Sequence, residues 1–213
     1  MNKKELPEKI HRSYKIWKKT VFNKNKEVYA RLARYGQKPH TMIISCCDSR
    51  VNPSLMFGDE IGNFFTHRNI GNIIPPYDAK GNDCGTSAAL EFGVRVLKVK
   101  HIVILGHSKC GAVKNGFHLC SDKQINPQLM FVNKWLKYIT PAYNLLEQTK
   151  NNGTMIKKLE KLNIINSITN LHKFPFIKKA VDLKALYIHG LWINIETGEL
   201  EALNSQKSIF EKV

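Results

Sequence analysis

The pattern of apolar and polar residues divides the chain into a helical N-terminal arm and a longer region of alternating strands and helices. Over the first 36 residues, apolar side chains recur at spacings of three and four with Lys and Arg between them, which predicts amphipathic helices ending at Gly36. This stripe consists of Ile10, Tyr14, Trp17, Val21, Val28, Leu32 and Tyr35. Its spacing leaves open whether it packs on its own domain or on a partner subunit.

From residue 41 the pattern changes to short apolar strands that alternate with helices. It predicts strands at 41–45, 63–67 and 101–105, helices at 53–57, 85–97 and 110–117, a mostly helical stretch at 127–171, and a late strand at 185–195 that turns through 196–199 into 200–203. Helix 85–97 is apolar nearly all round, so we expect it to be buried. The predicted fold class is α/β, with a mainly parallel central β-sheet, flanking helices and an N-terminal helical arm.

Length and composition predict a single domain. The 213 residues, 43% of them hydrophobic, can form one sizeable core, so we expect one domain over 1–213, with the arm at 1–36 and the α/β core at 40–213. No apolar run approaches the roughly 20 residues of a membrane span, and the basic start lacks the apolar segment of a secretory signal. We therefore expect a cytoplasmic protein that does not bind membranes.

The net charge of +16 raises the question of a nucleic acid partner. Residues 1–40 hold 12 Lys and Arg against 3 acidic residues, whereas residues 41–120 hold 8 against 6. The basic side chains lie mostly between apolar helix positions, and no basic motif is interleaved with aromatic residues. We therefore favour solvated helix faces over polyanion binding.

Two short segments place reactive side chains directly after buried apolar runs. Residues 42–44 lead to Cys46-Cys47-Asp48-Ser49-Arg50, and residues 102–106 lead to His107-Ser108-Lys109-Cys110-Gly111. Open α/β sheets bind ligands at the carboxyl ends of their strands. If the two strands are neighbours, Cys46, His107 and Cys110 converge as three zinc ligands, the number that leaves a catalytic zinc one open position. The odd set of five cysteines also favours metal ligands or buried thiols over disulfides in a reducing compartment.

Asp48 and Arg50 lie two positions apart in the first of these loops, where a guanidinium can orient a carboxylate. Three roles are open from the residues alone. Asp48 accepts a proton or a hydrogen bond from metal-bound water, it ligates the metal itself, or the pair is a structural ion pair that fixes a turn.

Three ordered motifs give the chain a resemblance to a known family. They are Cys46-x-Asp48-Ser49-Arg50-Val51-x-Pro53, Arg68-Asn69-x-Gly71-Asn72 and Gly106-His107-x-x-Cys110-Gly111. Together they resemble the β-class carbonic anhydrases, and the similarity runs from the arm to residues 196–200. The resemblance implies reversible hydration of carbon dioxide to bicarbonate and a proton by zinc-bound hydroxide. It implies one Zn2+ per chain on Cys46, His107 and Cys110, with Asp48 and Arg50 as the catalytic dyad.

The resemblance also implies substrate contacts and a homodimer or dimer of dimers. Gln37 is similar to the glutamine that donates a hydrogen bond to bicarbonate, and Phe65 to the aromatic residue that lines the carbon dioxide pocket, both reaching across a subunit interface. A turn residue and a core residue are the alternatives, and we favour function. Backbone N–H groups around Gly111, at a predicted helix start, are expected to stabilise the bicarbonate charge.

The chain departs from the family pattern at three positions. Phe92 stands where a tyrosine is common, and Cys47, expected to point into the core, stands where a serine is common. The branch with an allosteric bicarbonate pocket carries a tryptophan where this chain has Ile43, so we predict a plant-like, non-allosteric subtype with an open active site.

Two rival functions remain open from the sequence. The first is a zinc hydrolase of the same fold that acts on carbon disulfide. The second is a zinc-stabilised polyanion-binding module, which is disfavoured because a structural zinc site normally has four protein ligands. We interpret Cys84, Cys120 and His118 as structural, and we favour soluble buffer over His67 for proton transfer.

Overall fold

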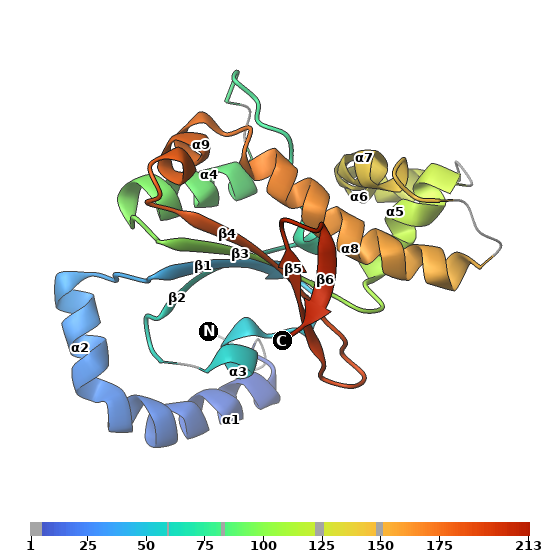
Figure 1. Ribbon diagram of the computed structural model, residues 1–213. Helices are drawn as coiled ribbons and strands as arrows, with labels where there is room; N and C mark the ends of the chain where they lie inside the picture. The colour runs from blue at the N-terminus through green and yellow to red at the C-terminus, as the bar shows by residue number, and fades with distance from the viewer. Residues whose placement is uncertain (1–5, 59, 82–83, 122–125, 148–150) are drawn as a thin grey trace.

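A central sheet forms the body of the molecule in the computed structural model, which describes residues 6–58, 60–81, 84–121, 126–147 and 151–213. Within these residues, six strands form one sheet in the order β2-β1-β3-β4-β5-β6 (Figure 1). Strands β2, β1, β3 and β4 are parallel, whereas β4-β5 and β5-β6 pair antiparallel, which confirms the predicted mainly parallel sheet. The strands are β1 (Thr41–Cys46), β2 (Phe64–Asn69), β3 (His101–His107), β4 (Tyr187–Ile193), β5 (Leu200–Asn204) and β6 (Ile209–Lys212).

The predicted helices are present, with ends shifted by a few residues. Helix α9, the short helical turn η3 and strand β6 had not been predicted, and residues 148–150 of the predicted helical stretch lie outside the described part. The helical segments are α1 (Glu8–Trp17), η1 (Lys18–Phe22), η2 (Asn23–Asn25), α2 (Lys26–Tyr35), α3 (Pro53–Phe57), η3 (Ile70–Asn72), α4 (Gly85–Glu91), η4 (Phe92–Val96), α5 (Gly111–Ser121), η5 (Pro127–Leu129), α6 (Met130–Leu136), η6 (Lys137–Ile139), α7 (Thr140–Tyr143), α8 (Asn152–Leu171) and α9 (Pro175–Asp182).

The two faces of the sheet are covered differently. Helices α4, α8 and α9 lie on one face, and α3 with the arm lies on the other (Figure 1). Alternation along β1 directs Met42 and Ile44 to the first face and Ile43 to the second. Helix α8 crosses β3 so closely that a Cβ atom on Gly106 would lie 2.7 Å from Cδ1 of Ile164. A glycine directly before His107 therefore sets how near α8 comes to the strand end.

The expected full burial of helix 85–97 is wrong for its outer side. Leu90 and Gly93 are buried against the sheet, but Phe92 and Val96 are 44% and 59% exposed. A helix packed on one sheet face buries only the side turned to that sheet. The apolar outer side is therefore left uncovered within the chain.

The predicted helical arm is present and projects from the sheet (Figure 1). It runs without a loop through α1, η1, η2 and α2. It ends at Gly36, whose φ of +78° lies outside the range of a right-handed helix. None of its residues between Glu8 and Tyr35 is buried. No helix in the described part of the chain is long and apolar enough to cross a membrane.

Candidate metal centre

Three buried ligand atoms converge at the carboxyl end of the parallel strands. Cys46 ends β1 and His107 ends the neighbouring β3, while Cys110 directly precedes α5. The two sulfur atoms and a ring nitrogen of His107 all lie within 4.8 Å of one another. The structure therefore brings together the three residues that the sequence singled out as zinc ligands.

The arrangement fits a tetrahedral zinc ion. The sulfur atoms of Cys46 and Cys110 are 3.9 Å apart, and two thiolates at zinc–sulfur distances near 2.3 Å in a tetrahedron lie roughly 3.8 Å apart. His107 Nδ1 donates a hydrogen bond to the Ser108 carbonyl oxygen at 2.9 Å. Its Nε2 is buried without a hydrogen-bond partner among the described residues. The free Nε2 lone pair is therefore suited to a metal, and the Nδ1 bond fixes the ring orientation.

Contacts among Cys46, His107 and Cys110 shift the pKa of each of these residues. A hydrogen bond from the Cys110 thiol is the main reason that the pKa of Cys46 falls to about 4, and the Gly71 N–H also donates to this sulfur at 3.4 Å. The same thiol–thiolate bond, together with burial, raises the pKa of Cys110. Burial opposes a charged His107, but the nearby Cys46 thiolate and the bond to the Ser108 carbonyl raise its pKa overall. A bound cation would take the place of these shared protons.

Asp48 and Arg50 form a bidentate ion pair beside the three ligand atoms. Arg50 donates from Nε to Asp48 Oδ1 at 2.9 Å and from Nη2 to Oδ2 at 2.8 Å, and its backbone N–H donates to Oδ1 at 3.0 Å. These bonds hold the pKa of Asp48 well below its usual range, so the carboxylate is ionised and only accepts. Asp48 Oδ2 lies 3.9 Å from His107 Nε2. The carboxylate is therefore next to the atoms that would hold a metal.

Arg68 holds the loop that carries the dyad. Its Nε donates to the Cys46 carbonyl at 3.0 Å, and its Nη2 donates to the Asp48 carbonyl at 2.7 Å. Arg68 belongs to the motif Arg68-Asn69-x-Gly71-Asn72, but the sequence predicted no separate role for it. Its position in β2, the strand beside β1, explains the role, because strand pairing brings its guanidinium to the end of β1.

The sequence predicted no role for Glu160, although the structure places it at the candidate metal centre. This residue of α8 is 3% exposed and accepts hydrogen bonds from the Cys110 backbone N–H and from Trp192 Nε1, both at 3.2 Å. Burial raises the pKa of its carboxyl group. In the sequence it stands between Leu159 and Lys161 in the run 157–162, which otherwise holds only Lys and Leu, so no local signal marks it.

The other three predicted site residues, Gly111, Phe65 and Gln37, lie in three different parts of the fold. Gly111 begins α5 next to Cys110, and a Cβ atom on it would meet no described atom within 4 Å, so the space beside it is open. Phe65 is half-buried in β2, with its ring centroid 5.8 Å from that of Phe92. Gln37 is exposed in the segment between α2 and β1. Neither Phe65 nor Gln37 belongs to the hydrogen-bonded cluster described above.

The expectation that Cys47 points into the core is wrong, because its side chain is exposed. Cys46 points into the metal centre, and successive side chains of an extended segment point to opposite sides. Cys47 therefore faces away from the centre, at a point where the strand has ended.

His67 bonds Thr86 Oγ1 through Nε2 at 3.0 Å, and burial lowers the pKa of His67.

A buried set of two cysteines and one histidine at the carboxyl end of a parallel sheet, with an ionised carboxylate beside it, is typical of metal-dependent enzymes of the α/β class. The carbonic anhydrase family model matches residues 41–200, which include the three candidate ligand residues and the Asp48–Arg50 pair. The chain belongs to the β-class carbonic anhydrase family.

Individual relatives agree with this assignment. A carbonic anhydrase of Helicobacter pylori is 33% identical over 88% of this chain and 86% of its own, and beta carbonic anhydrase 3 of Arabidopsis thaliana is 32% identical over 94% and 78%. The solved β-carbonic anhydrase CcaA superposes with a TM-score of 0.84 at 31% identity, covering 96% of this chain and 91% of its own. A tetrameric β-carbonic anhydrase of Sordaria macrospora gives 0.78 at 31% identity, covering 92% and 95%. The predicted family and fold class are thus confirmed, and the chain is a carbonic anhydrase.

Proposed function

We propose that this carbonic anhydrase catalyses the reversible hydration of carbon dioxide to bicarbonate and a proton, with one zinc ion held by Cys46, His107 and Cys110. The observation that carries the proposal is the convergence of three buried ligand atoms within 4.8 Å beside the Asp48–Arg50 pair. When bound, zinc lowers the pKa of a water ligand to about 7 and so supplies a nucleophile at neutral pH.

Asp48 orients the nucleophile, and Arg50 positions Asp48. Because Arg50 keeps the Asp48 carboxylate ionised, this group accepts a hydrogen bond from the attacking oxygen and directs the oxygen lone pair at the carbon atom of the substrate. Two side-chain bonds fix the carboxylate plane, and Arg50 Nη2 also donates to the Lys109 carbonyl at 3.2 Å. The dyad is thereby tied to the loop that carries His107 and Cys110. Asp48 acts as an acceptor in this proposal and does not ligate the metal.

The substrate pocket is completed by a second subunit. The open space at Gly111, beside the first backbone N–H groups of α5, suits an anionic product. Gln37 and Phe65 would be contributed by the partner, one as a donor to bicarbonate and the other as an apolar wall for carbon dioxide. Support for an assembly comes from the unburied arm and from the relative of Sordaria macrospora, which is tetrameric. We propose a homodimer or dimer of dimers, each chain forming one domain over 1–213 with the arm at 1–36 and the core at 40–213.

The same proposal includes the plant-like, non-allosteric subtype. Ile43 is 2% exposed and packs in an apolar cluster with Val51, Leu105 and Ile193. Arg68, which could otherwise bind an anion, already donates to two backbone carbonyls. These contacts favour an active site in which Asp48 stays paired with Arg50.

Zinc analysis combined with stopped-flow carbon dioxide hydration tests the proposal. We expect one zinc per chain and fast hydration at about pH 8, above the pKa of zinc-activated water. Removal of the metal by a chelator should abolish hydration, and added Zn2+ should restore it. One zinc per chain without hydration would refute the proposal. A parallel assay with carbon disulfide separates the rival hydrolase, which would act on that substrate alone.

A further inference from the structure

A second group of imidazoles lies at the opposite end of the strands that carry the metal centre. His101 is the first residue of β3, whose last residue is His107, and His189 is in the neighbouring β4. At about 3.3 Å per residue, the six steps from His101 to His107 span roughly 20 Å. The two histidines are therefore remote from the catalytic centre.

The sheet holds these two side chains together. His101 shares a sheet face with Val103, the register partner of His189, so both imidazoles lie on one face of adjacent parallel strands. Nδ1 of His101 and Nε2 of His189 are 3.0 Å apart and share one proton in a hydrogen bond. The ring of Tyr187 stacks on His101 with centroids 5.6 Å apart, and the ring centroid of His40 is 5.7 Å from that of His101. The position of the His101 ring is thus fixed by its neighbours.

We propose that His101 Nδ1 and His189 Nε2 form a second metal site, for a divalent cation of tetragonal geometry such as Ni2+ or Cu2+. Two nitrogen ligands about 2.1 Å from a metal and at a right angle lie roughly 3.0 Å apart, whereas a tetrahedral angle separates them by roughly 3.4 Å. The hydrogen-bonded nitrogens are 3.0 Å apart, so a cation with a right angle between its ligands could replace the shared proton without moving the two rings apart. Imidazole nitrogen is a preferred ligand of both metals.

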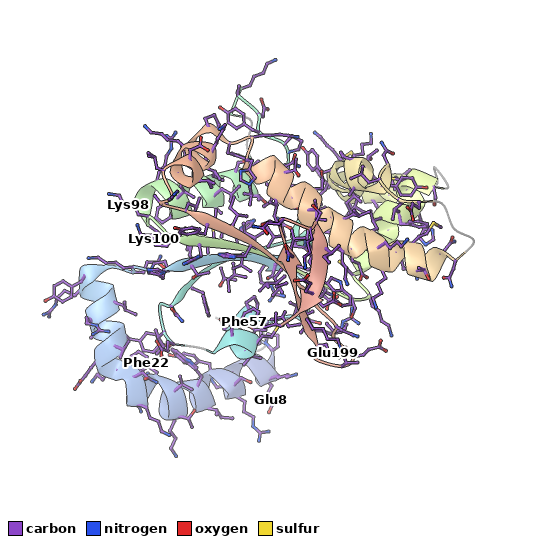
Figure 2. All side chains as sticks on the ribbon, viewed as in Figure 1. Glu8, Phe22, Phe57, Lys98, Lys100 and Glu199 are labelled. Carbon is purple, nitrogen blue, oxygen red and sulfur yellow. The ribbon has the colours of Figure 1, made fainter. Side chains whose placement is uncertain are left out.

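The protonation and charge of the surroundings set the properties of the site. Partial desolvation of its ring by the neighbouring side chains, and then the charge of His101, lower the pKa of His189, which favours the neutral ring that a metal requires. In the metal-bound form the ring protons must lie on the outer nitrogens, Nε2 of His101 and Nδ1 of His189. Figure 2 shows Lys98 and Lys100 at this same end of the sheet. Their positive charge disfavours a tightly held cation, so we expect exchangeable binding with water at the other coordination positions.

Calorimetric titration with NiCl2 tests the site in zinc-loaded protein without a polyhistidine tag. The wild type should bind one Ni2+ per chain while its zinc content stays constant. His189→Gln and His101→Asn should each weaken Ni2+ binding by about tenfold or more, because each leaves a single imidazole. Carbon dioxide hydration should be unchanged in His189→Gln.

His172→Gln is the matched control, because this histidine is exposed at the end of α8. It should keep the wild-type affinity for Ni2+. His189 is exposed, so its variant tests the site even if His101→Asn, at a half-buried and stacked position, fails to fold. The absence of one-to-one binding in the wild type, or wild-type affinity in His189→Gln, would overturn the proposal.

Discussion

The metal centre and the N-terminal arm differ in whether the side chains that define them are buried within the chain. At the metal centre Cys46, His107 and Cys110 are buried, and hydrogen bonds from several elements fix the residues around them. The arm has an equally regular apolar pattern, yet none of its residues between Glu8 and Tyr35 is buried. The three candidate ligands come from one chain, whereas we propose that the arm packs on a second subunit. Substitutions in the two regions should therefore fail in different ways.

The largest effect is expected at the centre, from Cys110→Ala. This variant loses one of three metal ligands and leaves a cavity beside the Cys46 sulfur, so zinc content should fall to near zero and hydration should disappear with it. Metal analysis of the purified protein and stopped-flow assays measure both quantities. Cys120→Ala is the matched control, since this half-buried thiol lies outside the cluster. A Cys110→Ala protein that retains stoichiometric zinc would contradict the ligand assignment.

Asp48→Ala should separate metal binding from turnover. Because Asp48 contacts Arg50 and lies beside His107 without being a proposed ligand, the variant should keep its zinc but lose about 10²-fold or more in turnover. Arg50→Gln should show the same pattern more weakly, since it acts through Asp48. Loss of zinc from Asp48→Ala with retained turnover per bound zinc would reverse the proposed roles.

The candidate ligands of the metal centre could be predicted from the sequence, whereas Glu160, which supports them, could not, for a physical reason. Cys46 and His107 end apolar strands and Cys110 follows three residues after His107, and parallel pairing of β1 with β3 brings these strand ends together. Glu160 reaches the centre from α8, about 50 residues further along the chain, through packing that no local pattern encodes. The exposed side of helix 85–97 was missed because periodicity records apolar positions but not which of them find a partner within the chain.

The arm should fail by dissociation and not by unfolding. Trp17 contacts aromatic rings of its own arm, with the Tyr29 centroid at 5.9 Å, and is 37% exposed. Trp17→Asp should therefore leave zinc content and the folded core intact while shifting the assembly to smaller species in sedimentation experiments. Hydration should then fall on dilution, because the partner's Gln37 and Phe65 leave the pocket. Lys15→Asp, on the same helix between the apolar positions, is the control for charge. An unchanged assembly in Trp17→Asp would refute this role for the arm.

Glu160→Ala should destabilise the centre through its support. It leaves the Cys110 N–H and the Trp192 indole N–H buried without their acceptor, at a cost of about 1–3 kcal/mol for each group. Urea unfolding of the zinc-loaded protein measures the loss, and Glu160→Gln, which keeps one acceptor oxygen, should recover part of it. Glu27→Ala in α2 is the matched exposed control and should change stability by less than about 0.5 kcal/mol. Equal stability of the two alanine variants would show that the carboxylate does not support the loop.

The smallest expected effect is the response to bicarbonate. An allosteric anion site would need space at Ile43 and a free guanidinium at Arg68, but Ile43 is buried in an apolar cluster and Arg68 donates to the carbonyls of Cys46 and Asp48. We therefore expect Arg50 to stay hydrogen-bonded to Asp48 as the bicarbonate concentration rises. Hydration rates should show simple product inhibition without cooperativity in bicarbonate, at neutral pH and below. Cooperative inhibition, or a crystal structure at such pH with Asp48 bound to zinc, would show that the centre shares the dependence on outside contacts that we assign to the arm.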